Sequence, residues 1–142
     1  MSQILLRFQS LFEKIPHDLI ALIARIAVGT VFFRSGLLKL EGWKEGNTLF
    51  LFQEEYKLPL IPPEIAAYMA TAAELTLPVL LFAGLFTRYA ALSMLIMTLV
   101  IQVFVYPNAF DTHGVWAVCL LYLMKHGAGN LALDRFIEPR SK

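Results

Sequence analysis

The chain has 142 residues, of which 58% are apolar and only 16% are charged, and its formal net charge is +1. This apolar content is too high for an ordinary soluble domain, and a near-neutral chain without a basic stripe is not a nucleic-acid binder. The charges gather in a few short stretches and leave four long apolar runs between them. A single membrane domain covering residues 1–142 is therefore predicted.

The first 15 residues are predicted to form an amphipathic helix. Apolar side chains share one helical face over residues 3–15, while Arg7, Glu13 and Lys14 take the other, and Pro16 ends the pattern. Such a stripe fits a helix that lies on the membrane surface or one that docks on the protein's own surface. The charges argue against a cleavable signal peptide, so the first span is expected to be its own insertion signal.

Four membrane-spanning helices are predicted in chain order, over about 18–40, 64–84, 88–106 and 111–126. The first three approach the ~20 residues that a 30 Å hydrocarbon core requires. The fourth is short, so either the loop before it dips into the membrane or the bilayer thins. Residues 41–63 are expected to form a long loop with one short surface or re-entrant helix. The predicted fold is an all-α transmembrane four-helix bundle with a short interfacial segment at 130–137.

The distribution of lysine and arginine predicts that both termini are cytoplasmic. With that orientation the inner side holds Arg7, Lys14, Arg88, Lys125, Arg135, Arg140 and Lys142, against Lys39, Lys44 and Lys57 outside. The long loop and the segment before the fourth span then face the opposite side.

Charged side chains inside the spans are the first candidates for function, because each costs roughly 2.5–3.5 kcal/mol at mid-bilayer. At 1.5 Å per residue, Arg25 lies about 10 Å and Glu74 about 15 Å from the inner face, a gap that an extended guanidinium closes. An Arg25–Glu74 ion pair is therefore predicted. It either locks the first span to the second, or lets Glu74 relay a proton or bind a ligand head group.

A second polar group is expected near the outer end of the bundle. Arg34 is nine residues beyond Arg25 and half a turn out of phase, so the two arginines belong to different sites. Arg34 and Gln102 lie at similar depth, with His113 and Trp116 closer to the outer interface. This group either binds an anion or polar head group, or consists of an ordinary aromatic belt with Arg34 and Lys39 reaching toward water.

The sequence predicts neither a metal site nor a covalently bound cofactor. Its three histidines are isolated, and its single cysteine, Cys119, lies in an apolar run without a CxxC or CxxCH partner. No residue is assigned a catalytic role. The chain is then at most an oxidoreductase subunit without a redox centre of its own.

Three segments together resemble the DoxX family of small four-helix membrane proteins. They are LIARIAVGTVFFRSGLLKLEGW at 22–43, AAELTLPVLLFAGLFTRYAAL at 72–92 and THGVWAVCLLYL at 112–123. The family often has a histidine before the glycine of the first span, where this chain has Arg34-Ser35-Gly36. A histidine-based site is therefore not carried over, and Arg34 is the distinctive feature.

The resemblance implies a bacterial inner-membrane protein. The family name derives from a subunit of a thiosulfate:quinone oxidoreductase, which suggests quinone-linked redox work. The segments EEYKLPLIPPE and VIQVFVYPNAFDTHG are similar to a subgroup found beside genes for small copper- or metal-handling peptides. We therefore expect a membrane subunit or partner of a quinone-linked redox or metal- and oxidative-stress system. A quinone or similar amphipathic ligand would contact Arg25, Glu74 and Arg34.

Two other functions stay open, a non-catalytic membrane anchor or scaffold for partner proteins and a small transporter or lipid-binding module. A pocket at Glu74 between the first two spans would favour ligand binding, and a filled core would favour the scaffold. Water-lined access from both faces would favour transport. Gly29 and Gly36 share a helix face and fit a close contact either within one bundle or between copies.

Overall fold

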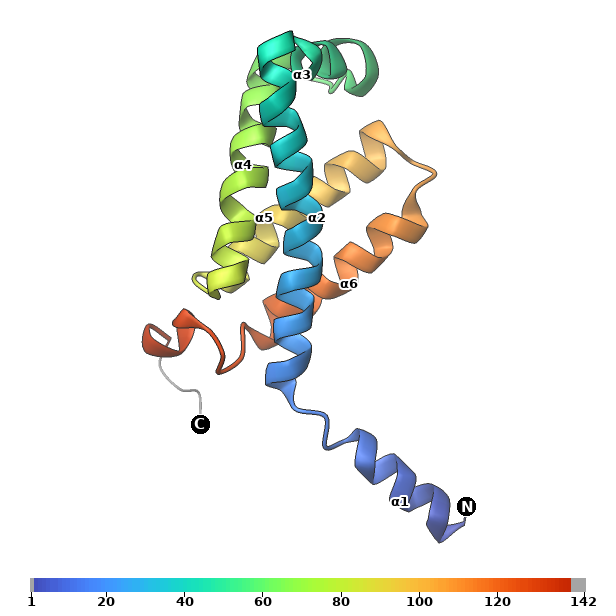
Figure 1. Ribbon diagram of the computed structural model, residues 1–142. Helices are drawn as coiled ribbons and strands as arrows, with labels where there is room; N and C mark the ends of the chain where they lie inside the picture. Colours follow the sequence, from blue (N-terminus) through green and yellow to red (C-terminus); the bar gives the residue numbers. More distant parts are fainter. Residues whose placement is uncertain (1, 139–142) are drawn as a thin grey trace.

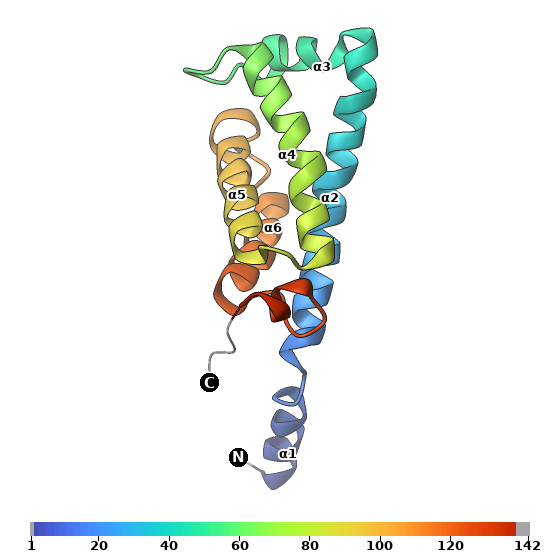
Figure 2. The same ribbon diagram turned by 90° about the vertical axis from the view of Figure 1, so that its left-hand side faces the viewer.

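The computed structural model describes residues 2–138, and this range is helical without any strand. Its long helices are α2 (His17–Glu45), α4 (Pro63–Ala83), α5 (Thr87–Val100), continued by the π-helix η2 (Ile101–Val105), and α6 (Phe110–His126). They run alternately up and down and pack together, as Figures 1 and 2 show. Arg140 and Lys142, counted above on the inner side, lie outside the described residues.

Three of these helices are long and apolar enough to cross a membrane: α2, α4 and α5 with η2. The fourth long helix, α6, has 17 residues. At 1.5 Å per residue it reaches about 25 Å, less than the ~30 Å of a hydrocarbon core. The chain is a helical membrane protein, and the fourth crossing stays a prediction.

Prolines and glycines set the helix boundaries. Pro16 precedes α2, and Pro62 and Pro63 begin α4, where a missing N–H leaves no helical hydrogen bond unmade. Gly84 ends α4 at a φ of 66° and Gly46 ends α2 at a φ of 75°, both in the left-handed region that glycine adopts without strain.

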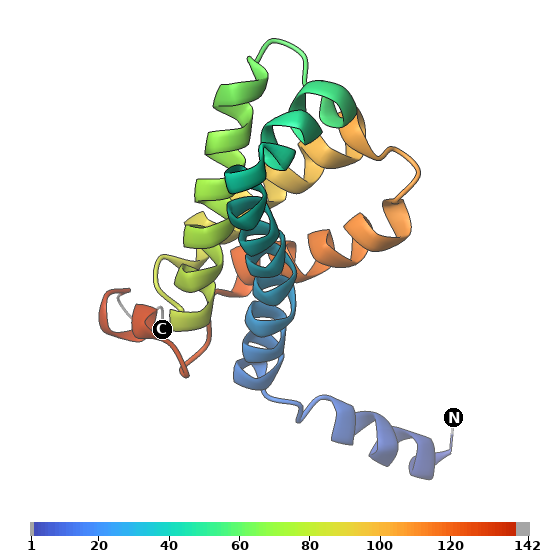
Figure 3. The same ribbon diagram turned by 45° about the horizontal axis from the view of Figure 1, so that its top comes forward.

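The connection between α2 and α4 differs from the predicted loop at 41–63. α2 continues to Glu45 because no helix-ending conformation occurs before Gly46. It is followed by α3 (Asn47–Phe50) and the π-helix η1 (Leu51–Tyr56), which pack against α4 at the top of the bundle (Figure 2) and lie near η2 (Figure 3). The predicted short helix is therefore present, but it follows a longer first span.

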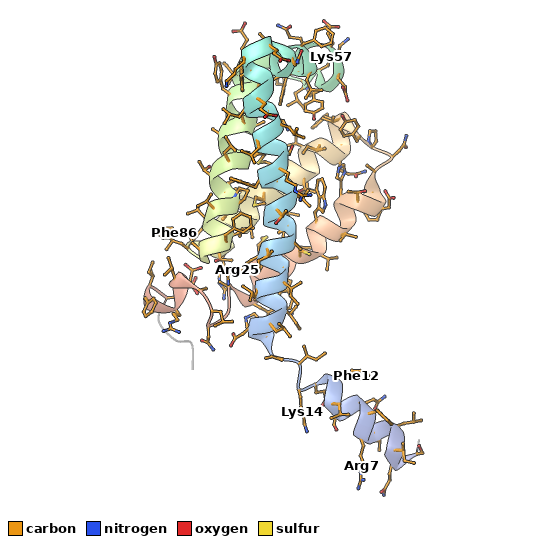
Figure 4. The ribbon with its side chains drawn as sticks, viewed as in Figure 1. Arg7, Phe12, Lys14, Arg25, Lys57 and Phe86 are labelled. Carbon is orange, nitrogen blue, oxygen red and sulfur yellow. The ribbon has the colours of Figure 1, made fainter. Side chains whose placement is uncertain are left out.

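The N-terminal helix α1 (Gln3–Phe12) does not dock on the protein. None of its residues is buried, and Ile4, Phe8, Leu11 and Phe12 are more than half exposed. Figure 4 shows Arg7, Phe12 and Lys14 projecting away from the bundle. Of the two placements open from the sequence, docking on the bundle is wrong, and a membrane-surface position stays a prediction.

The C-terminal segment, predicted as a short interfacial segment at 130–137, is bound to the bundle, and its place at the membrane interface stays a prediction. Its short 3-10 helix η3 (Leu133–Phe136) carries Asp134, which is only 5% exposed. The Asp134 carboxylate accepts hydrogen bonds from the backbone N–H groups of Phe86 at 2.6 Å and Thr87 at 2.9 Å, where α5 begins. Asp134 thereby caps α5, while Leu131, Leu133, Phe136 and Ile137 remain exposed.

Candidate functional site

Arg25 does not pair with Glu74, so the predicted ion pair is wrong. The guanidinium is buried and donates instead to four backbone carbonyls. Nε contacts Leu81 O at 2.7 Å, Nη2 contacts Phe82 O at 2.8 Å, and Nη1 contacts Leu131 O at 2.8 Å and Ala128 O at 3.2 Å. Two of these carbonyls end α4 and two belong to the C-terminal segment, toward which Arg25 extends from α2 (Figure 4). The role of Arg25 is to join these elements.

Glu74 pairs with Lys39, which the sequence had placed at the outer interface. The Lys39 ammonium lies 2.9 Å from Oε2 and 3.1 Å from Oε1 of Glu74, and 2.8 Å from the Ser35 hydroxyl. The two charged side chains are 8% and 4% exposed. The predicted first span ends at residue 40, which places Lys39 at its end, near the interface. In the structure α2 continues to Glu45 and packs along α4, so Lys39 lies within the helix and faces α4.

A close approach of α2 and α4 makes this ion pair possible. A Cβ atom at Gly36 would lie 2.9 Å from the carbonyl carbon of Glu74 and 3.0 Å from its oxygen, so no larger residue fits. Pro78, inside α4, has no N–H to donate to the Glu74 carbonyl four residues earlier. Gly29 packs likewise against Phe82. Both glycines therefore serve contacts within one chain.

The structure brings Gln102, His113 and Trp116 together. The Nδ1 of His113 lies 2.7 Å from the Gln102 amide oxygen, and Gln102 Nε2 donates to the carbonyl of Pro107 at 2.7 Å. The His113 and Trp116 rings are 4.9 Å apart between centroids. His113 is 5% exposed, whereas Gln102 and Trp116 are partly buried, and the interfacial position of the group stays a prediction.

Arg34 does not join this group. It lies on α2 with an exposed side chain, half a turn away from the face that carries Arg25 and Lys39. No hydrogen bond or ion pair of Arg34 is present within residues 2–138. The out-of-phase spacing correctly separated Arg34 from Arg25, but the assignment of Arg34 to the outer polar group has no support in the geometry.

An apolar pocket of about 450 Å³ lies between α2, α4, α5, α6 and the two π-helices. Its polar lining residues are Ser35, Lys39, Tyr56, Glu74, Tyr106 and His113; Trp116 and the apolar side chains Phe32, Phe52, Met97 and Val105 form much of the remaining wall. Ligand sites are typically cavities of this size with apolar walls and a few convergent polar groups. The pocket therefore joins the inner Glu74 site to the outer His113 site.

Two tyrosines at the end of the pocket formed by the two π-helices remain protonated. Burial raises the pKa of the Tyr56 hydroxyl, and burial followed by the neighbouring Glu55 carboxylate raises the pKa of the Tyr106 hydroxyl. Tyr106 donates a hydrogen bond to Glu55, and the Tyr56 and Tyr106 rings meet edge to face at 5.9 Å. The Tyr56 ring also lies 6.0 Å from the Lys39 ammonium.

A second, polar cavity of about 820 Å³ lies at the opposite end of the bundle. His17 and His126 line it, with 5.5 Å between ring centroids, and His17 Nδ1 lies 2.7 Å from the Tyr122 hydroxyl. Asp18, which also lines this cavity, binds the backbone N–H and the side chain of Asn130. Residues 2–138 contain no cluster of His, Cys, Asp and Glu able to hold a metal ion.

Sequence reasoning missed Lys39 and Ser35 as pocket residues. The available signal was helical phase: Lys39 follows Arg25 by 14 residues, which is close to four turns, and so shares its buried face. Ser35 precedes Lys39 by one turn and accepts its hydrogen bond. Tyr56 gave no such signal, because its position depends on how η1 folds back over α4.

The family model described as DoxX matches residues 20–107. A Haemophilus influenzae protein, described as an uncharacterized protein, is 34% identical over 127 residues, which covers 82% of this chain and 82% of that relative. No solved structure matches. The family match includes Lys39, Glu74 and Gln102 but ends before His113.

Proposed function

This chain belongs to the DoxX family of membrane proteins, and on that basis we propose that it binds a small amphipathic ligand, a quinone or a quinone-like ring, in the pocket at Glu74. The protein then acts as the membrane subunit or partner of a quinone-linked redox or metal- and oxidative-stress system. It does so in the bacterial inner membrane with both termini cytoplasmic. Under this orientation the pocket lies toward the periplasmic side.

The observation that carries the proposal is the pocket itself. A filled bundle core would have favoured a scaffold, whereas about 450 Å³ remains open beside a buried ion pair. Lys39 and Glu74 cancel each other's charge, so a neutral ring suits the pocket better than an ion. The walls supply apolar contact area, and Tyr56, Tyr106 and His113 supply polar contacts at one end.

The anchor or scaffold function has one observation in its favour, which is the unpartnered α1. Its exposed apolar face, with Phe8 and Phe12, can bind lipid or a partner protein without the pocket. The two functions are compatible, because α1 precedes the start of α2 (Figure 1), whereas the α2 residues that line the pocket lie between Val31 and Lys39.

Decylubiquinone binding to the purified protein tests the proposal. Trp116 lines the pocket, so in a Trp43→Phe background its fluorescence should be quenched saturably by decylubiquinone. Ala73 also lines the pocket, and Ala73→Phe fills it without removing a charge. The variant should weaken binding at least tenfold, a loss of about 1.4 kcal/mol.

Ala72→Phe is the matched control, because Ala72 is exposed on the neighbouring face of α4. It adds the same ring without entering the pocket and should leave the titration unchanged. Equal weakening by both variants, or quenching without saturation in the parent protein, would rule out the pocket as a quinone site.

A further inference from the structure

The pocket offers a ligand an unequal set of hydrogen-bonding groups. An ammonium has three N–H donors and no acceptor, and all three of those of Lys39 are directed to Ser35 Oγ and the two oxygens of Glu74. Lys39 therefore has no donor left for a ligand carbonyl. The Glu74 carboxylate retains lone pairs, because it can accept about four hydrogen bonds.

The protonation of His113 follows from its neighbours. A carbonyl oxygen only accepts, so the nitrogen of the Gln102 amide must face Pro107 O, and the amide oxygen must face His113. The His113 Nδ1 consequently carries the proton and donates it to Gln102. In the neutral ring Nε2 is then an acceptor with a free lone pair.

This Nε2 atom is available to accept a hydrogen bond from a ligand in the pocket. Within residues 2–138 no protein group hydrogen-bonds it, and the one fully enclosed side-chain polar atom without a partner is the Thr87 hydroxyl. Nε2 is therefore not sealed inside the protein, and the pocket is the cavity that His113 lines.

Acceptors discriminate between the two redox forms of a quinone-like ring, and donors do not. A quinone carbonyl only accepts, whereas a quinol hydroxyl both donates and accepts, so Tyr56 and Ser35 can serve either form. Only a hydroxyl can satisfy His113 Nε2. We infer that the pocket selects the reduced, hydroxyl-bearing form of its ligand, with His113 Nε2 accepting the hydroxyl hydrogen and Gln102 acting as the positioning residue. This inference rests on the proposed ligand pocket.

A pair of redox-inert probes tests the selection. We would titrate 4-nonylphenol and 4-nonylanisole into the Trp43→Phe protein and follow Trp116 fluorescence; in the anisole a methyl group replaces the hydroxyl hydrogen, so only the phenol can donate. The phenol should bind about tenfold more tightly, the factor expected for one net hydrogen bond in a buried site. A ratio near one would overturn the inference.

Two variants assign the selection to His113. His113→Phe removes the acceptor and keeps an aromatic ring beside Trp116, whereas Gln102→Glu keeps the imidazole and places a carboxylate at Nδ1. That carboxylate favours the doubly protonated ring, in which Nε2 becomes a donor. Both variants should bring the phenol-to-anisole ratio close to one, and Gln102→Glu should also tighten decylubiquinone binding.

The outcomes separate the selection from the pocket. Saturable decylubiquinone binding with a ratio of one leaves the ligand pocket standing and refutes the selection. A tenfold ratio that survives in both variants assigns the acceptor to another group and also refutes the role of His113. If none of the three probes binds the parent protein, the proposed pocket function fails together with the inference.

Discussion

The Lys39 ammonium and the Glu74 carboxylate lie 2.9 Å apart, and less than a tenth of either side chain is exposed. Removing such ions from water costs several kcal/mol each, which their attraction offsets only if the remaining donors are also paired. Ser35 provides the third acceptor for Lys39. The ion pair therefore needs no ligand to satisfy the Lys39 donors, and both of its residues line the pocket.

Replacing one residue of this pair should destabilise the protein more than replacing both. Lys39→Met or Glu74→Leu alone leaves one buried charge without its partner and should lower the free energy of unfolding by about 3–5 kcal/mol. The double variant leaves no charge and should recover most of the loss. Unfolding in detergent followed by circular dichroism measures the three values, with the exposed Glu64→Gln on the same helix as a control. Strictly additive losses would show that the pair is not coupled.

At the residue scale, the position of an arginine around its helix predicted whether it is buried, whereas its depth along the helix did not predict its partner. The nine-residue offset between Arg25 and Arg34 correctly separated a buried from an exposed arginine. Arg25 and Glu74 lie at similar predicted depths, but depth does not distinguish a carboxylate from a backbone carbonyl as the partner of a guanidinium. Backbone carbonyls carry no sequence signature, so the four acceptors of Arg25 could not be read from the chain.

At the scale of elements, Arg25 connects three parts of the chain. The last carbonyls of a helix lack partners in its regular ladder. Arg25 donates to Phe82 and to Leu81 at the end of α4, and Leu81 also accepts from the Gly84 N–H. The same guanidinium holds the C-terminal segment, in which Asp134 caps the start of α5. The α4–α5 turn is thereby fixed from both sides.

Arg25→Lys should destabilise the protein although it keeps the charge. An ammonium has three donors at one point and cannot reach carbonyls on α4 and on the C-terminal segment together. We expect a loss of about 3 kcal/mol from two broken charge-assisted hydrogen bonds, measured by thermal unfolding in detergent. Hydrogen exchange at residues 128–134 should accelerate at the same time.

Arg34→Lys is the control for this substitution, since it makes the same chemical change at an exposed position on the same helix. Its effect should lie within about 0.5 kcal/mol. A similar loss in both variants would mean that the carbonyl contacts of Arg25 contribute nothing specific.

At the scale of the whole molecule, four crossings predict that the two ends of α6 are accessible from opposite sides of the membrane. In a Cys119→Ser background, cysteines at Ser2 and Glu138 should label from the cytoplasmic side with an impermeant maleimide. Cysteines at Gln53 and Asn108 should label from the other side. These four positions are exposed in the structure, so accessibility within the protein does not limit labelling. Asn108 and Glu138 labelling from one side would leave three crossings.

The long apolar runs made the helices predictable, because a membrane leaves few alternatives for such segments. The connection at 41–63 was less predictable, because the tertiary packing of η1 over α4 determines its conformation. Of the predicted outer group, Gln102, His113 and Trp116 do meet, but Lys39 was assigned to the wrong environment and Arg34 has no partner within residues 2–138.

Three residues that line the pocket, Val31, Met69 and Ile96, also have exposed side chains on α2, α4 and α5. In a bilayer these faces would meet lipid, so the proposed hydrophobic ligand would enter sideways without passing through water. Its relevant concentration is then its mole ratio to lipid. An affinity that looks high against an aqueous concentration can be modest on that scale, and occupancy should follow the composition of the membrane.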